Sequence, residues 1–299
     1  MSVVDRWRYT YDAYGRFSSR SDARQHNRTD FAFDVDSQLL AAQSDSAPEA
    51  PEYYAYDANG GTLGRRVHGK TDDFHRDTIT RTAGGLPARA ASRVLRYSGD
   101  RRLAEVVERT QEPGSGDNER PIARYEHNAL GQRIRKTVFG ADPTASSDKR
   151  NTQYLWQSYR LVGEMPESGP TAALSRRHVY AHGVPIAVID YPAGGTLAPQ
   201  RSQLADTLRA LWHVLKGDAP RIHYIHTDEI GTPTAVTNQN RQVVWRTTHT
   251  AFGEAQPIAS PDGKARFTLE LRLPGQYHDA ETGWHDSVLR TYDPRRGQY

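Results

Sequence analysis

In the stretch Tyr54-Ala55-Tyr56-Asp57-Ala58-Asn59-Gly60-Gly61-Thr62-Leu63, two aromatic residues two positions apart are followed by Asp, Asn and Gly and then by a second apolar position. Side chains alternate between the two faces of a strand, so aromatic residues two apart lie on the same face. Asp, Asn and Gly are the residues that tight turns use. The stretch therefore predicts two antiparallel strands joined by a tight turn.

The same pattern recurs along the first half of the chain. The other copies begin at Tyr9, Phe31, Leu95 and Arg124. The second aromatic of each copy falls at residue 11, 33, 56, 97 or 125, and the longest interval has room for a degenerate copy near Thr78–Arg81. A single hairpin cannot bury its apolar face and must pack beside its neighbours. We therefore expect an all-β chain of repeated antiparallel hairpins that pack beside one another.

The composition excludes several classes of protein. The chain has no Cys, so it has no disulfide framework, no thiolate metal site and no cysteine nucleophile. Mean hydropathy is −0.79 and no apolar run approaches the roughly 20 residues that span a bilayer. The first residues lack the apolar core of a signal peptide. We expect no membrane span, and either secretion by a route other than Sec or a cytoplasmic location before delivery.

Charge and motifs argue against nucleic-acid binding and against an ordinary metabolic enzyme. The net charge of +3 is spread along the chain, and acidic residues lie among the densest basic stretches, such as Arg133–Lys136. The sequence has no phosphate-binding glycine loop and no hydrolase or metalloprotease motif. His223, His226 and Asp228 have metal-ligand chemistry, but positions 223 and 226 point to opposite faces of a strand. We expect no metal and no cofactor, and we expect Asp228 to bond the backbone of a turn.

One segment has a helical pattern. Leu204, Leu208, Leu211, Trp212 and Leu215 form an amphipathic stripe, which predicts a helix over 201–215 that covers the sheet or binds a partner. We expect a hairpin array over 1–190, a loop-plus-helix insertion over 191–219 and C-terminal repeats over 220–299, all in one structural unit.

The C-terminal region carries an ordered series of short motifs. They are His226-Thr227-Asp228…Gly231-Thr232-Pro233, Ala251-Phe252-Gly253, Gly275-Gln276-Tyr277…Glu281-Thr282-Gly283 and Tyr292-Asp293-Pro294…Gly297. With the upstream Tyr-Asp hairpins, the series resembles the RHS/YD-repeat family, and specifically the C-terminal part of an RHS core. That family includes bacterial RHS polymorphic toxins, the C components of insecticidal toxin complexes and the barrel of the animal teneurins.

The resemblance implies a spiralling β-sheet or part of a hollow β-shell. In bacterial members such a shell encloses a variable C-terminal toxin domain and serves type VI secretion and interbacterial competition. It implies a structural role in encapsulation or delivery, with the toxin domain, its immunity protein or a component of the secretion apparatus as partners. Open sheet edges would also favour self-association. The alternative function is a stand-alone surface module that binds carbohydrate or protein, and a nuclease-like enzyme has only the mild basicity in its favour.

The resemblance also implies a site. Many members cleave themselves by an aspartyl-type reaction near two Asp-Pro motifs; Asp293 matches the first motif, and Arg290 matches an arginine associated with cleavage. The sequence ends at Tyr299, before a second Asp-Pro, so we expect Arg290 and Asp293 to be a remnant of this region. Relatives commonly have His-Tyr-Asn where this chain has His285-Asp286-Ser287.

Overall fold

The computed structural model of the chain describes residues 7–22, 27–45, 48, 51–58, 60–67, 70–73, 80–81, 87–90, 93–110, 118–145, 148–166, 175–191, 219–258 and 267–299. Throughout these ranges the regular structure is antiparallel β-strand, as expected, and contains no α-helix. The helix predicted at 201–215 lies outside the described residues. Within the described part of the chain, no helix is long and apolar enough to cross a membrane.

The first seven strands form one sheet in which each strand pairs with the next in the chain. They are β1 (Trp7–Tyr11), β2 (Phe17–Asp22), β3 (Asn27–Phe33), β4 (Leu39–Ser44), β5 (Glu52–Tyr56), β6 (Thr62–Val67) and β7 (Lys70–Asp73). The three N-terminal repeats account for the hairpins β1–β2, β3–β4 and β5–β6.

The next fourteen strands form a second sheet with the same neighbour-to-neighbour order. They are β8 (Thr80–Arg81), β9 (Pro87–Ala90), β10 (Arg93–Tyr97), β11 (Leu103–Thr110), β12 (Asn118–His127), β13 (Arg133–Phe139), β14 (Lys149–Gln157), β15 (Arg160–Pro166), β16 (Arg176–Ala181), β17 (Val184–Asp190), β18 (Arg221–Thr227), β19 (Pro233–Asn238), β20 (Val243–His249) and β21 (Ala255–Pro257). The last two repeats form the hairpins β10–β11 and β12–β13.

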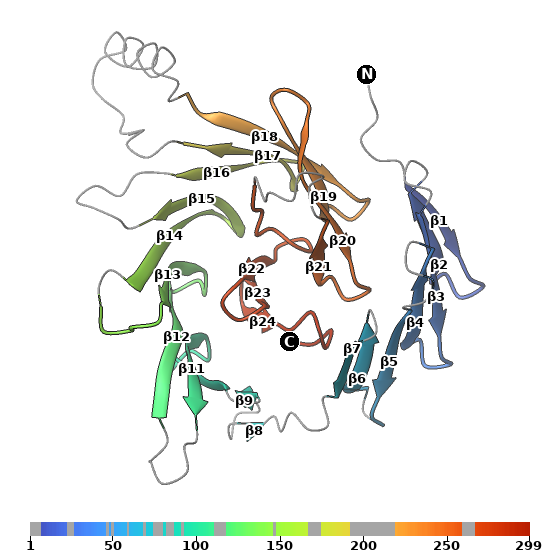
Figure 1. The fold of residues 1–299 in the computed structure, drawn as a ribbon, viewed down its shortest axis with the longest axis horizontal. Helices are drawn as coiled ribbons and strands as arrows, with labels where there is room; N and C mark the ends of the chain where they lie inside the picture. Colours follow the sequence, from blue (N-terminus) through green and yellow to red (C-terminus); the bar gives the residue numbers. More distant parts are fainter. Residues whose placement is uncertain are drawn as a thin grey trace.

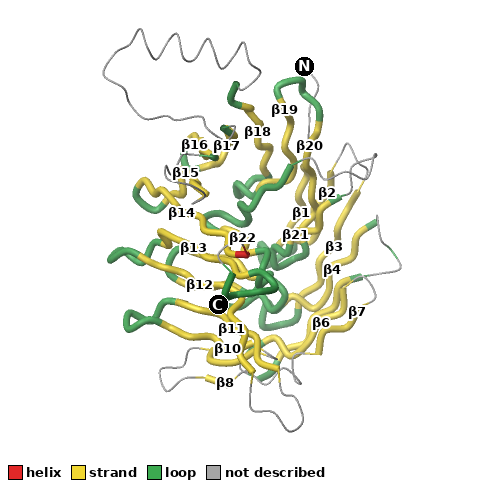
Figure 2. Tube along the Cα trace, turned by 60° about the vertical axis from the view of Figure 1, so that its left-hand side comes forward, coloured by secondary structure: helices red, strands yellow, loops and turns green. Residues whose placement is uncertain are grey.

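A small third sheet lies inside the curve of the second. It consists of β22 (Tyr277–Asp279), β23 (Trp284–Ser287) and β24 (Arg290–Tyr292). Figure 1 shows the 14-stranded sheet bending around these strands, with the seven-stranded sheet on the opposite side. The view in Figure 2 also places the C-terminus between the two large sheets. The chain therefore forms a curved wall whose inner face is covered by its own C-terminal segment.

The Asp of each Tyr-Asp pair closes a turn. In the β5–β6 hairpin the backbone N–H of Asp57 donates to the carbonyl oxygen of Gly61 over 2.8 Å, and the N–H of Gly61 donates to the Asp57 carboxylate over 2.7 Å. Gly60 has φ +79°, a value that glycine adopts without strain. In six other hairpins the side chain of the first turn residue likewise accepts a backbone N–H. These residues are Asp12, Asp34, Ser98, Asn128, Asp228 and Asn238. The prediction that Asp228 bonds its own turn is confirmed.

A β-bulge follows the turn in most of these hairpins. In β12–β13, Glu126 pairs with Arg135 and His127 pairs with Arg133, so Ile134 is the extra residue. The same shift occurs in β1–β2, β3–β4, β5–β6, β10–β11, β14–β15, β16–β17 and β18–β19. A bulge interrupts the alternation of side chains and increases the local twist. The repeated bulges therefore suit a sheet that has to curve.

The core lies between the inner face of the 14-stranded sheet and the C-terminal segment. The largest apolar cluster combines sheet residues with four residues of that segment: Tyr154, Leu161, Val188, Ile225, Val236, Phe267, Leu269, Leu271 and Tyr277. The Tyr154 and Tyr277 rings meet edge to face with centroids 5.4 Å apart. A second cluster around Val106 and Tyr125 packs against Trp284 of β23. Burial of these large rings contributes much of the apolar contact in a chain with few aliphatic residues.

Candidate functional site

The candidate site is the inner surface where residues 267–299 meet the two large sheets. A turn at Leu273–Gln276 leads into β22, with the N–H of Gln276 donating to the carbonyl oxygen of Leu273 over 2.8 Å. The carbonyl oxygen of Asp279 accepts the N–H groups of Thr282 and Gly283, which reverses the chain into β23. Local turns thus shape the segment, while its position depends on contacts with the sheets.

Arg133 of β13 makes the most deeply buried of these contacts. Its side chain is 3% exposed, and its Nη1 donates to Asp279 of β22 over 2.6 Å. Its Nη2 lies 3.6 Å from the Asp286 carboxylate of β23. The rings of Tyr125, Tyr154 and Tyr277 surround the guanidinium, each with its centroid 5.2 to 5.5 Å from Cζ. One arginine therefore fastens two strands of the C-terminal segment to the wall.

Lys136 of the same strand completes the cluster. Its Nζ donates to Asp279 over 2.9 Å and lies 3.3 Å from Glu281. Arg133 and Lys136 are three residues apart, a spacing that would place them on opposite faces of a regular strand. The bulge at Ile134 shifts the alternation, so both cations point inward and are buried. This pairing of two basic and three acidic side chains was missed by sequence reasoning.

Charge balance decides the protonation of this cluster. Burial opposes ionisation of Asp279, but the nearby Arg133 and Lys136 outweigh it and hold the pKa of Asp279 below its ordinary value. Burial raises the pKa of Asp286, and the more distant Arg133 only partly offsets that effect. Burial also disfavours the Lys136 ammonium, yet Asp279 and Glu281 keep the pKa of Lys136 above its ordinary value. Asp279 is therefore the ionised centre of the cluster, and Asp286 is the carboxyl that takes up a proton more readily.

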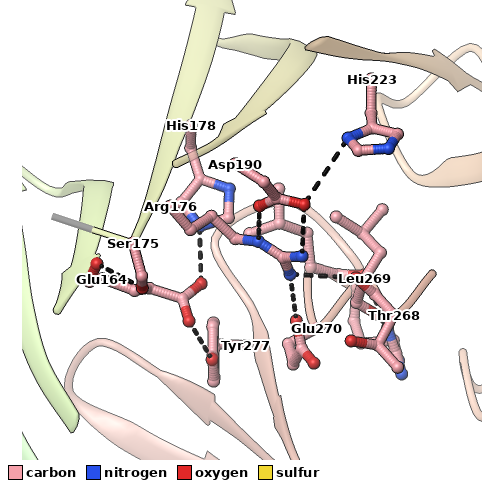
Figure 3. A network of polar contacts seen from close by, with 12 residues as sticks. Glu164, Ser175, Arg176, His178, Asp190, His223, Thr268, Leu269, Glu270 and Tyr277 are labelled. Carbon is pink, nitrogen blue, oxygen red and sulfur yellow. Dashed lines mark hydrogen bonds and ion pairs between the residues drawn. The ribbon is translucent and has the colours of Figure 1, made fainter. Parts of the chain in front are cut away.

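A second polar network joins β15, β16 and β17 to the same segment (Figure 3). Glu164 lies 2.8 Å from His178 Nε2 and accepts the Tyr277 hydroxyl over 3.1 Å. Arg176 binds Asp190 through Nε over 2.7 Å and Glu270 through Nη1 over 3.0 Å. Burial opposes ionisation of Glu164, but its bonds, led by His178, hold the pKa of Glu164 below its ordinary value.

The N-terminal sheet is tied to the C-terminal residues as well. Thr62 of β6 donates its hydroxyl to the carbonyl oxygen of Arg296 over 2.6 Å. Arg65 pairs with Glu254 over 2.6 Å, and the rings of Tyr54 and Phe252 lie 4.7 Å apart. Residues far apart in the sequence therefore meet at one place, between the two sheets.

The two residues predicted from the resemblance line a common cavity of about 230 Å³ near this junction, together with Asp279 and Asp286. Arg290 of β24 places its guanidinium 4.1 Å from the centroid of the Tyr299 ring. Asp293 begins the last turn: its carboxylate accepts the N–H of Arg295 over 2.9 Å. Burial raises the pKa of Asp293, and the bond from Arg295 only partly opposes this.

The histidines that resembled a metal motif have separate partners. His223 lies 3.6 Å from Asp190 and packs on the Phe267 ring with centroids 4.3 Å apart. The Nε2 of His226 is 3.0 Å from the Thr237 hydroxyl. In the part of the chain that the structure describes, no group of three or more His, Asp and Glu side chains is arranged to hold a metal ion.

Comparison with known proteins also indicates a resemblance to the RHS family. A family model described as RHS protein matches residues 222–257. Double-stranded DNA deaminase toxin A of Burkholderia cenocepacia is 27% identical over 98% of this chain, and Toxin protein Tse5 of Pseudomonas aeruginosa is 27% identical over 97% of it. The matches cover 18% and 24% of those two proteins, so this chain spans less than a quarter of either.

A solved structure shares the fold. The Tc holotoxin pore of Photorhabdus luminescens, which contains TccC3, superposes on 98% of this chain with a TM-score of 0.65. The identity is 15% and the superposition covers 15% of that chain. The likeness therefore concerns the curved β-architecture.

Proposed function

Because the chain is an RHS-type protein, we propose that it is a section of the shell wall of a secreted-toxin scaffold, with a structural role in enclosing or presenting a toxin. The two relatives named as toxins support a toxin-related role. The proposed partners are a toxin domain joined C-terminally to this region, its immunity protein and a component of the secretion apparatus. The proposed route is type VI secretion, which does not use the Sec pathway, in competition between bacteria.

The observation that carries this proposal is the way in which the C-terminal segment is held. Its strands β22 and β23 are fastened to the wall by Arg133, whose charge is compensated by the buried carboxylates of Asp279 and Asp286. The C-terminus lies between the two large sheets (Figures 1 and 2). A polypeptide joined after Tyr299 would therefore start on the inner side of the wall.

Protease accessibility tests this proposal. A short flexible segment with one protease site is added after Tyr299, and the same segment is inserted in a matched control between Pro143 and Thr144, in an exposed loop. We expect the site after Tyr299 to be cut about tenfold more slowly in the folded protein, which corresponds to about 1.4 kcal/mol of local opening free energy. Equal rates at the two positions, with both sites cut equally in denaturant, would contradict an inward-held terminus.

We propose that Arg290 and Asp293 are the remnant of a self-cleavage region and act here as structural residues. In support, the Asp293 carboxylate is engaged by the Arg295 N–H, and Arg290 stacks on Tyr299. We expect mass spectrometry of the purified protein to show the intact chain, for the wild type and for Asp293→Asn alike. A clipped species that is present in the wild type and absent from Asp293→Asn would instead demonstrate retained cleavage.

A further inference from the structure

A groove of about 350 Å³ lies between three neighbouring hairpin turns and the segment 271–277. Trp156 and Tyr159 come from the first hairpin, Tyr180 from the second and Ile230 from the third. The volume and the mainly apolar and aromatic walls are typical of sites that bind ligands. This groove is separate from the cavity that contains Arg290 and Asp293.

The charged side chains of the groove have one sign. Arg160 and Arg272 line it, and no Asp or Glu is among the described residues that do so. Arg272 is only 8% exposed; its Nη1 donates to the carbonyl oxygens of Leu269 and Leu271, whereas its buried Nε has no hydrogen-bond partner. Burial lowers the pKa of Arg272 to about 10, because nearby Glu270 and Tyr277 do not fully offset it. A carboxylate in the groove would compensate this charge.

Arg160 is an exposed residue of the groove lining. It begins β15, is exposed, and reaches the turn of the next hairpin at Gly183. A Cβ atom at position 183 would lie 3.3 Å from Arg160 Nη2, and Gly183 has φ +87°, so glycine suits this close approach. The guanidinium is therefore placed where an entering ligand would meet it.

The rim extends the apolar surface beyond the pocket itself. Tyr159 is 63% exposed and Ile230 is 54% exposed, although both belong to the groove. Their hairpins are four strands apart along the sheet, which corresponds to about 19 Å in a flat sheet and to roughly six residues of extended chain. Exposed apolar side chains on hairpins that are several strands apart suit an extended peptide better than a compact small molecule.

We infer that this groove is a docking site for an extended peptide segment that carries carboxylate side chains beside an apolar one. The apolar side chain enters between Trp156 and Tyr180, and the carboxylates pair with Arg160 and Arg272. Tyr159 and Ile230 cover the flanking peptide backbone. This inference concerns ligand binding at the groove, whereas the shell proposal rests on Arg133 and on the position of the C-terminus, so each can hold or fail without the other.

Binding of three defined probes tests the inference on the full chain. They are the blocked peptide Ser-Asp-Phe-Asp-Ser, its counterpart Ser-Asn-Phe-Asn-Ser, and free phenylacetate, each titrated by calorimetry at low salt. We expect the Asp peptide to bind at least about tenfold more tightly than the Asn peptide. We expect Arg160→Gln and Tyr159→Ala each to weaken that binding about fivefold or more. Arg135→Gln, which changes an arginine of β13 outside the groove, is the matched control and leaves it unchanged.

Three outcomes would overturn the inference. The first is the absence of any binding of the Asp peptide to the folded wild type. The second is equal affinity for the Asp and Asn peptides, which would show that the arginines do not bind the peptide carboxylates. The third is phenylacetate binding as tightly as the peptide, which would make the groove a small-molecule carboxylate site. Arg272 is left intact throughout, since its bonds to Leu269 and Leu271 support the fold.

Discussion

Arg133→Met is expected to lower the free energy of unfolding by about 3 to 5 kcal/mol, the range found when one partner of a buried ion pair is removed. The variant would leave the Asp279 carboxylate buried with Lys136 as its remaining cation, and it would remove the guanidinium that lies 3.6 Å from the Asp286 carboxylate. Met has a similar length and fills much of the space among the three tyrosine rings. The predicted loss is therefore mainly electrostatic.

Urea unfolding followed by circular dichroism measures this effect. Arg135→Met is the matched control, because Arg135 lies two residues away on β13, is 37% exposed at its side chain and pairs with Glu126 over 3.2 Å. We expect the control to change stability by about 0.5 kcal/mol or less. A change of less than about 1 kcal/mol for Arg133→Met would show that the cluster does not hold the segment.

A second variant separates charge from packing. Asp279→Asn added to Arg133→Met removes the stranded carboxylate, and we expect the double variant to recover part of the loss. The two residues are in contact, so their effects on unfolding free energy should not add. Strict additivity would argue that the cost of Arg133→Met comes from lost packing.

Acidification from pH 7 to pH 5 is expected to lower the free energy of unfolding, and four buried histidines together contribute at most about 7 kcal/mol to this loss. Four described histidines have strongly lowered pKa values, chiefly because burial disfavours the charged ring and secondly because neighbouring Arg or His side chains repel it. Their pKa values are about 4 for His127, about 3 for His249, about 4 for His278 and about 3 for His285. In the unfolded chain each histidine has a pKa near 6.5.

The sign of the effect follows from proton uptake. Well above pH 6.5 these histidines are neutral in both the folded and the unfolded chain, so their protonation does not affect stability there. Between pH 6.5 and about pH 4 the unfolded chain binds protons that the folded chain excludes. Each histidine then lowers the free energy of unfolding by up to about 1.4 kcal/mol for each unit that the pH falls. Asp286 and Asp293 act in the opposite direction, because their pKa values are raised in the folded state. The expected net loss is therefore smaller than the sum of the histidine contributions.

Urea unfolding at a series of pH values between 7.5 and 5 tests this prediction. His249→Gln removes one proton that only the unfolded chain takes up. It should therefore reduce the slope of the unfolding free energy against pH by up to about 1.4 kcal/mol per pH unit. His182→Asn is the control, since His182 is exposed in a turn and has φ +49°, a conformation that Asn tolerates. If stability does not change with pH across this range, the folded protein does not prevent protonation of the four histidines, and the prediction is wrong.

Local pattern predicted the strands and turns well. The alternation at Tyr54 and Tyr56 identified the hairpin β5–β6, and the Asp at 57 closes its turn as a side-chain acceptor. These features depend on contacts within a few residues, so the sequence contains all the information that they need. The resemblance to the RHS/YD-repeat family rested on motifs of the same kind.

The candidate site was harder to predict because its partners are distant in the chain. Arg133 and Asp279 are separated by 146 positions, and neither residue belongs to a motif that names the other. A spacing of three residues places Arg133 and Lys136 on opposite faces of a regular strand, and only the bulge at Ile134 brings them to the same face. The one available signal was a dense basic stretch in a strand that also carries apolar residues.

By itself, the sequence determined that this protein is built from antiparallel hairpins, because alternation and turn chemistry are local properties. It also determined that strand pairing and packing, without disulfides, hold the wall together, since the chain has no Cys. Only the tertiary structure decided that residues 267–299 cover the inner face, that Arg133 meets Asp279 there, and that Arg160 and Arg272 share a groove. Curvature brings such residues together, and it accumulates over many bulged hairpins, so no single stretch of sequence contains it.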